Sequence, residues 1–334
     1  MDYNQIISDL KNKIYSPVYF LEGEEPFFMD QISHFILENV LTEEEKGFNQ
    51  SIFYGKDLSI DSIMTAAKRF PMMAERQVVV IREAQNIRNI EDLASYAENP
   101  MRSTLLVINY KYKSIDKRKR LYKGLQKNGV YFESKPLYDN QVPAWISKYL
   151  KEKNLGIDPR AAQMIADYIG SDLQRIVNEL DKVTISLVPG TSVMPEDVER
   201  NIGISKDFNF FELQKALGNR EILKSNRIIN YFIDNEKQNS LTSIIGNLAT
   251  YFRKLLIYHS IENKTDRGAM AQKLGVNPFF INDYISASKN YSLDKAVNII
   301  SMMREYDLRS KGGRGGSTPN GDLLRELTFK ILHI

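Results

Sequence analysis

The fold of this 334-residue chain is set by one segment, Phe70-Pro71-Met72-Met73-Ala74-Glu75-Arg76-Gln77-Val78-Val79-Val80-Ile81. Upstream of it, apolar residues recur at helical spacing, which predicts a short amphipathic helix over residues 59–70. Pro71 disfavours helical geometry at the residue before it and so ends that helix. Residues 78–81 are wholly apolar and β-branched, which is typical of a strand buried on both faces. A helix and a central strand are therefore joined by a short link that carries two methionines.

Met72 and Met73 allow two interpretations. A link between a helix and a strand normally lies on the surface and is polar. Methionine is flexible and polarisable, and it is frequent on binding surfaces, so the pair could form a docking element. The two side chains could equally fold back beneath the helix and fill the core. The residue types alone favour neither interpretation.

Strand and helix patterns alternate around this link, from residue 1 to residue 140. Strands are expected over residues 18–21, 51–54, 78–81, 104–108 and 130–132, and helices over residues 26–40, 59–70, 91–98 and 116–127. Such alternation predicts an α/β domain in which helices cover a parallel sheet.

The pattern becomes all-helical near residues 135–137. Asp158 and Pro159, for example, are an N-cap residue and a first-turn proline that together predict a helix start. We therefore expect an α/β domain over residues 1–140, a small helical domain over residues 141–206 and a further helical domain over residues 207–334.

Composition excludes several classes of protein. The chain has no cysteine, which excludes disulfides and thiolate metal sites, and its three histidines show no zinc-enzyme spacing, so we expect no metal. The net charge of +3 is too small to indicate a dedicated nucleic-acid binder. No apolar run approaches the roughly 20 residues that span a bilayer, and the first residues lack the layout of a signal peptide, so we expect a cytoplasmic protein without membrane contact.

The first strand-to-helix turn argues against a nucleotide enzyme. A phosphate loop needs several glycines, a lysine and a hydroxyl residue. Residues 21–26 offer one glycine, no lysine and three glutamates, whose charges would repel phosphate. Arg82 and Glu83 follow the third strand, where a magnesium-binding acidic pair would be expected. The sequence therefore predicts no catalytic site and no cofactor.

The most basic stretch of the chain lies between residues 111 and 123. Its candidate DNA or partner contacts are Lys117, Arg118, Lys119, Arg120 and Lys123, interleaved with tyrosines. Such a stretch could follow a phosphate backbone. The alternative, a solvated helix face, is the more common role of a charge run.

A resemblance gives the link a more specific interpretation. Met72 and Met73, followed by Ala74, Glu75, Arg76 and an apolar strand, resemble the clamp-binding segment of the delta subunit of the bacterial DNA polymerase III clamp loader. That family usually has an aromatic residue where this chain has Met73. The helical region after residue 141 resembles the small lid domain of AAA+-type proteins. Three further segments, at residues 251–256, 274–279 and 306–311, resemble the delta C-terminal collar domain.

The resemblance implies a fold and a function. The fold is an AAA+-like parallel-sheet domain without a functional phosphate loop, a helical lid and a helical collar. The implied protein is a component of a DNA-directed DNA polymerase, a nucleotidyltransferase holoenzyme, that hydrolyses no ATP itself during replication. Phe70, Pro71, Met72 and Met73 would bind the sliding clamp (beta) and open its ring. The collar would join the gamma/tau-type and delta-prime-type subunits, and primed DNA would bind within the assembly.

Two other functions are alternatives to a delta subunit, and each would differ from it in one structural feature. A delta-prime-like scaffold would be an inactive AAA+-like protein of the same assembly without a clamp-binding element, although the zinc-binding cysteines often seen in delta-prime are absent here. A nucleic-acid-dependent ATPase would need the phosphate loop that this sequence lacks.

Overall fold

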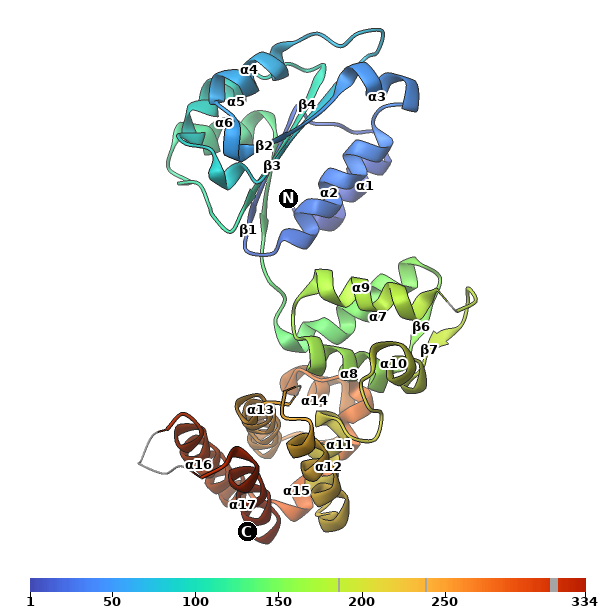
Figure 1. Ribbon diagram of the computed structural model, residues 1–334, viewed down its shortest axis with the longest axis vertical. Coiled ribbons are helices and arrows are strands. Elements are labelled where there is room, and N and C mark those ends of the chain that lie inside the picture. The colour runs from blue at the N-terminus through green and yellow to red at the C-terminus, as the bar shows by residue number, and fades with distance from the viewer. Residues whose placement is uncertain (186, 238, 313–317) are drawn as a thin grey trace. The chain divides into compact units, whose positions relative to one another are not determined.

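The computed structural model describes residues 1–334 apart from residues 186, 238 and 313–317, and it comprises two compact units (Figure 1). The first unit covers Met1–Pro136 and the second covers Leu137–Ile334. The boundary falls where the sequence pattern changes from alternating strands and helices to helices alone. Within the described residues, no helix combines the length and apolar character needed to cross a membrane.

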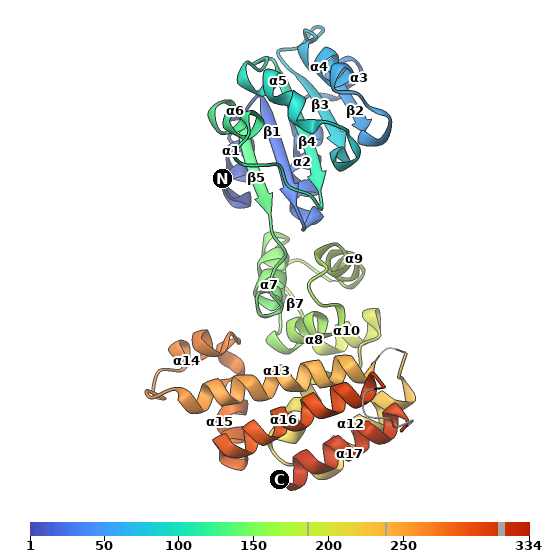
Figure 2. The same cartoon turned by 90° about the vertical axis from the view of Figure 1, so that its left-hand side faces the viewer.

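The first unit is built on a parallel sheet. Its strands are β1 (Val18–Gly23), β2 (Gln50–Tyr54), β3 (Gln77–Arg82), β4 (Thr104–Lys111) and β5 (Val130–Ser134). Their order is β2-β3-β4-β1-β5, and every neighbouring pair is parallel (Figure 2). Each strand expected from the sequence is present. β1, β3 and β4 are buried along nearly their whole length, as continuous apolar runs require.

Helices cover both faces of this sheet (Figure 1). α1 (Tyr3–Lys11) and α2 (Pro26–Asn39) cover one face, and α4 (Ile60–Lys68), α5 (Ala94–Glu98) and α6 (Arg120–Asn128) cover the other. Since side chains alternate along a strand, Val78 and Val80 pack with the first pair while Val79 and Ile81 pack with the second group. α3 (Glu43–Asn49) leads directly into the edge strand β2.

Three helix boundaries differ by more than one residue from the sequence-based expectation. The helix expected from residue 91 begins at Ala94, because Ile90–Leu93 form a 3-10 helix. The helix expected from residue 116 begins only at Arg120, because the Asp116 carboxylate accepts a hydrogen bond from the Arg118 backbone N–H at 3.0 Å. Such a local bond offers the backbone an alternative to the helix. The helix expected to reach residue 70 ends at Lys68, and Arg69 is extended. Phe70 therefore lies beyond the helix, in the link.

In its described residues, the second unit is helical apart from one short parallel pair of strands, β6 (Gly156–Ile157) and β7 (Ser192–Val193), which the sequence did not indicate. Its first helices are α7 (Val142–Glu152), α8 (Pro159–Ile169), α9 (Leu173–Thr184) and α10 (Pro195–Ile202). The later ones are α11 (Phe210–Gly218), α12 (Ile222–Asp234), α13 (Leu241–Ser260), α14 (Arg267–Leu274), α15 (Ile281–Asn290), α16 (Leu293–Ser310) and α17 (Asn320–His333).

A single hydrophobic core joins the later helices, with α13 packed against α16 and α12 against α17. The predicted fold class is thus confirmed: an α/β domain built on a parallel sheet precedes a region that is helical apart from β6 and β7. The division of that region into a lid over residues 141–206 and a collar over residues 207–334 stays a prediction.

Candidate functional site

The link between α4 and β3 presents four residues, Phe70, Pro71, Met72 and Met73, which we call the apolar tip. Phe70 is 73% exposed, Met72 is 55% exposed and Met73 is fully exposed, while Pro71 is half-buried. Neither methionine fills the core. Large apolar side chains exposed together mark interaction sites more often than single exposed ones do.

The backbone of the tip is held by Asn49, the last residue of α3. The Met72 N–H donates to Asn49 Oδ1 at 2.7 Å, and Asn49 Nδ2 donates to the Met72 carbonyl oxygen at 2.9 Å. Asn49 is buried, so these bonds are shielded from competing water. The next residue, Met73, has a φ of 53°, in the left-handed region that side chains other than glycine seldom adopt. Asn49 thus fixes the peptide that precedes a strained residue.

The sheet explains why Asn49 and Met72 meet. Gln50 pairs with Val78 in the parallel register of β2 and β3. The segments that enter these two strands therefore lie at the same edge of the sheet, with α3 beside the link (Figure 1).

A second amide secures the base of the tip. Gln77 begins β3 and is buried, and its Nε2 donates to Thr104 Oγ1 at 2.8 Å and to the Ala66 carbonyl oxygen at 3.2 Å. It also hydrogen-bonds the Arg69 carbonyl oxygen. These carbonyl oxygens belong to the last turn of α4 and its cap, where the regular helical hydrogen bonds end. The tip therefore projects from a rigid base.

Another exposed aromatic residue directly precedes Asn49 in the chain. Phe48, in α3, is 64% exposed, and its carbonyl oxygen accepts a hydrogen bond from Arg69 Nη2 at 3.0 Å. Sequence reasoning missed both Phe48 and Asn49. Residue 49 lies 23 positions from residue 72, and no periodicity connects them.

The first strand-to-helix turn is filled by its own carboxylates. Glu22, at the carboxyl end of β1, is fully buried; its Oε2 accepts the Ile115 N–H at 2.8 Å and its Oε1 accepts the Tyr131 hydroxyl. Burial raises the pKa of the Glu22 carboxyl. Glu25 is also buried and caps α2 by accepting the Phe27 N–H at 2.9 Å.

Gly23, the glycine of this turn, allows β1 and β5 to approach each other closely. A Cβ on Gly23 would lie 2.0 Å from the Ser134 carbonyl oxygen, so β5 approaches where a side chain would stand. Gly23 therefore permits a close approach of two strands. Together with Glu22 and Glu25, it leaves no phosphate-binding loop of the usual chemistry at this turn.

The basic stretch is paired with acidic residues of the same unit. The ion pairs are Lys117–Glu133 at 2.7 Å, Arg118–Asp116 at 2.8 Å, Lys119–Glu91 at 3.8 Å and Arg120–Glu98 at 2.7 Å. The Arg118 hydrogen bonds lower the pKa of Asp116, and those of Arg120 lower the pKa of Glu98. Lys123 is exposed and forms no ion pair with any residue that the structure describes. Exposed pairs of this kind contribute little to stability because water and salt screen them, so a phosphate could replace the acidic partner.

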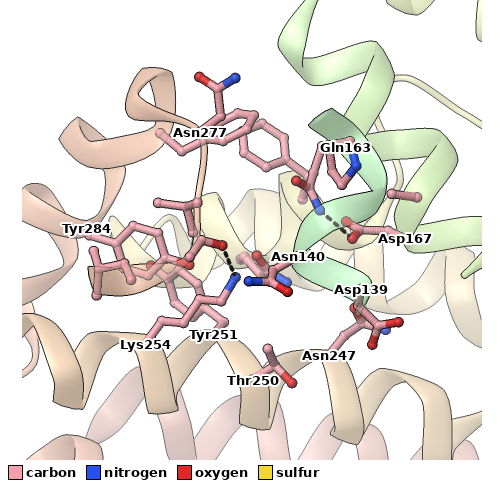
Figure 3. A pocket seen from close by; sticks show the side chains of 18 of the residues that line it. Asp139, Asn140, Gln163, Asp167, Asn247, Thr250, Tyr251, Lys254, Asn277 and Tyr284 are labelled. Carbon is pink, nitrogen blue, oxygen red and sulfur yellow. Dashed lines mark hydrogen bonds between the residues drawn. The ribbon is translucent and has the colours of Figure 1, made fainter. Parts of the chain in front are cut away.

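The second unit contains a cavity of about 980 Å³ that the sequence did not indicate (Figure 3). Lys254 of α13 and Asp167 of α8 both line it, yet they form no ion pair with each other. Lys254 Nζ donates to the Gly275 carbonyl oxygen at 3.3 Å, and Asp167 accepts Gln163 Nε2 at 2.7 Å. Burial raises the pKa of Asp167 to about 6 and lowers that of Lys254. Burial in the cavity therefore disfavours the charged form of both side chains.

Comparisons with known proteins agree on one family. The family model described as "DNA polymerase III, delta subunit" matches residues 19–135, and a second model, for the C-terminal domain of that family, matches residues 207–324. The DNA polymerase III subunit delta of Bacillus subtilis (strain 168) is 26% identical over 317 residues, which cover 91% of this chain and 90% of that protein. A solved structure, the Bacillus subtilis DNA clamp loader delta protein, aligns over 100% of both chains with 23% identity and a TM-score of 0.51, and shows the same fold.

Proposed function

The chain belongs to the DNA polymerase III delta subunit family, and on that premise we propose that it binds a sliding clamp and opens its ring within a clamp loader. The opened ring could then be placed on primed DNA. The observation that carries the proposal is the apolar tip, whose exposed Met72 and Met73 side chains stand on a backbone fixed by Asn49.

The tip has the properties of a docking anchor. Binding energy at protein interfaces concentrates in a few large side chains that fill pockets of the partner. Ordering a flexible loop on binding costs free energy, and a backbone already held by hydrogen bonds avoids much of that cost. Met72 and Met73 would enter an apolar pocket of the clamp near a contact between clamp protomers.

Ring opening would follow from differential affinity. A ligand shifts an equilibrium between two states only by as much as it binds one of them more tightly. The tip would therefore bind the open ring better than the closed ring. A preference of about 5.5 kcal/mol would convert a ring that is about 1% open into one that is about 99% open.

We further propose that this chain neither binds nor hydrolyses ATP. Support comes from the buried Glu22 and Glu25, which accept internal hydrogen bonds where phosphate would need donors. ATP-driven subunits elsewhere in the assembly would then control access to the tip.

The remaining partners would bind the helical region and the basic stretch. Exposed apolar side chains on α12, α16 and α17 suit a collar that joins gamma/tau-type and delta-prime-type subunits; they are Ile222, Leu223, Leu293, Val297, Leu308 and Phe329. Lys117, Arg118, Lys119, Arg120 and Lys123 would approach primed DNA, with the phosphates replacing their acidic partners.

Clamp binding and ring opening are tested on the purified full-length chain and its cognate clamp. We expect a stable complex by analytical size exclusion. A fluorophore pair placed across the clamp interface should separate when the chain is added. A chain that joins the other loader subunits but leaves the clamp unbound would contradict the proposal and favour the delta-prime-like scaffold.

A further inference from the structure

The apolar tip has a neighbour that the proposed function does not use. Phe48 is as exposed as the tip residues, and it comes from a different element, α3. Three hydrogen bonds join the end of α3 to the link. Arg69, just before the tip, donates to the Phe48 carbonyl oxygen, and Asn49 exchanges two bonds with Met72.

We propose that Phe48 is a second apolar anchor for the same clamp, and that Asn49 is the positioning residue that holds Phe48 and the apolar tip in one surface. This inference rests on the proposed function, because it assigns a second contact to the same partner. It divides the clamp-binding surface between two segments that are far apart in sequence.

The hydrogen bonds make the two segments one rigid body. Asn49 follows Phe48 in the chain, and its amide binds both polar groups of Met72 at 2.7 and 2.9 Å. A movement of α3 relative to the tip would break both bonds, leave the buried Asn49 Oδ1 without its donor, and leave Asn49 Nδ2 only its bond to the Glu45 carbonyl oxygen at 3.1 Å. Such a loss is costly, so the two anchors keep a fixed separation.

The start of α3 is fixed as well. Thr42 and Glu45 form a reciprocal capping box: the Glu45 carboxylate accepts the Thr42 N–H at 2.9 Å, and Thr42 Oγ1 accepts the Glu45 N–H at 3.4 Å. Asn49 is the one residue of α3 that is buried, so the helix contributes little to the core. Its packing does not explain an exposed phenylalanine at residue 48, whereas a role in binding does.

The clamp is the partner that we expect to contact Phe48, because the segment that carries Phe48 adjoins the apolar tip. A partner that receives Met73 must approach the link, and the bonds from Arg69 and Asn49 place Phe48 at the rim of that contact. The partner would present an apolar pocket for the methionines and a flatter apolar face for the phenyl ring. A second copy of this chain is the competing occupant, and the experiment separates the two.

The first test is Phe48→Ala in the full-length chain, titrated with the cognate clamp. We expect clamp affinity to fall about tenfold, the effect of removing an interface anchor, with unchanged melting because the side chain is exposed. Tyr54→Ala is the matched control, since Tyr54 is a 55% exposed aromatic residue of the same unit and ends β2, at the end of the strand opposite to α3. Equal clamp affinities for Phe48→Ala and Tyr54→Ala would overturn the assignment of Phe48. Loss of self-association with unchanged clamp affinity would overturn it in favour of a second copy.

The second test is Asn49→Ala. Asn128→Ala is its control, because Asn128 Nδ2 also bonds two backbone carbonyls, those of Ala97 at 3.0 Å and Glu98 at 2.9 Å, away from the tip. We expect both variants to melt somewhat earlier, but only Asn49→Ala to weaken clamp binding about tenfold and to speed hydrogen exchange at the Met72 amide. Asn49→Asp keeps the acceptor and loses the donor, so its affinity should be intermediate. Normal clamp binding by folded Asn49→Ala and Asn49→Asp would overturn the positioning role.

A third variant separates this inference from the proposed function. If Met72→Ala with Met73→Ala abolishes clamp binding while Phe48→Ala and both Asn49 variants bind normally, the proposed function stands and the two-part surface is wrong. If the methionine variant also binds normally, the proposed function itself fails.

Discussion

Asn49 and Met72 are 23 residues apart in sequence and exchange two hydrogen bonds, one in each direction. The buried side-chain amide of Asn49 pairs with the backbone N–H and the carbonyl oxygen of Met72. The Met72 backbone is therefore held in place while the side chains of both methionines stay exposed.

Met72→Ala combined with Met73→Ala should weaken clamp binding well over tenfold, because truncating an interface anchor often costs about 2 kcal/mol or more. Helicity and melting should stay unchanged, since Met73 is fully exposed and Met72 is mostly so. Fluorescence titration of the clamp and thermal melting followed by circular dichroism measure the two properties.

The control for this variant is Ile185→Ala, which truncates another exposed apolar side chain. If the methionines were core residues, the double variant would lose about 2–5 kcal/mol of unfolding free energy per side chain. Early melting together with normal clamp affinity would therefore contradict the prediction.

ATP should not bind to the isolated chain. Glu22 is fully buried and already accepts hydrogen bonds from Ile115 and Tyr131, and a carboxylate there would repel phosphate. Isothermal titration calorimetry with Mg-ATP should give no heat of binding. Magnesium-dependent binding in the micromolar range would show that the turn accommodates phosphate after all.

Neutralising the basic stretch should flatten the salt dependence of primed-DNA binding by the assembled loader. The logarithm of the DNA-binding constant falls linearly with the logarithm of the salt concentration, and each lost phosphate contact makes this slope shallower by about 0.9. The variant carries Lys117→Gln, Arg118→Gln, Lys119→Gln and Arg120→Gln. Binding is measured by fluorescence anisotropy over a salt series.

The control for the basic stretch removes the same number of ion-paired cations elsewhere, at Lys46, Lys153, Lys182 and Lys206. If the two variants show the same slope, the stretch only forms ion pairs within its own unit and has no DNA contact.

Asp167→Asn should make stability less dependent on pH. Burial raises the pKa of Asp167 from 3.8 to about 6, so the folded chain holds this proton more tightly than the unfolded chain does. The stabilisation from Asp167 is therefore complete below pH 3.8 and is lost as the pH rises through about 6. Asparagine cannot ionise, so the variant should lose less unfolding free energy over that interval than the parent protein.

Urea unfolding at several pH values between about 4 and 8, which bracket the shifted pKa, measures this difference. Asp181→Asn is the control, because Asp181 is an exposed carboxylate paired with Lys153. Parallel pH curves for Asp167→Asn and the parent protein would show that the cavity does not perturb Asp167.

Local sequence patterns were enough to predict the change from an α/β domain to helices near residues 135–137, and they argue against a phosphate loop. Residues 78–81 form a buried strand because β-branched side chains favour the extended conformation and a continuous apolar run favours burial on both faces of a sheet. The glutamates at positions 22, 24 and 25 likewise argue against phosphate whatever their neighbours are. Such features are local, and local periodicity and charge are what a sequence displays directly.

The construction of the candidate surface, by contrast, depends on tertiary contacts. Asn49 meets Met72 because β2 and β3 are neighbours in the sheet, with Gln50 opposite Val78. The acidic partners of the basic stretch, such as Glu98 for Arg120, also come from distant segments. Pairings of this kind depend on strand order and on which side chains the packing buries, and neither leaves a repeating pattern along the chain. The sequence therefore located the methionines, whereas the tertiary structure decided that they are exposed, that Asn49 holds the Met72 backbone, and that α3 is bonded to the link.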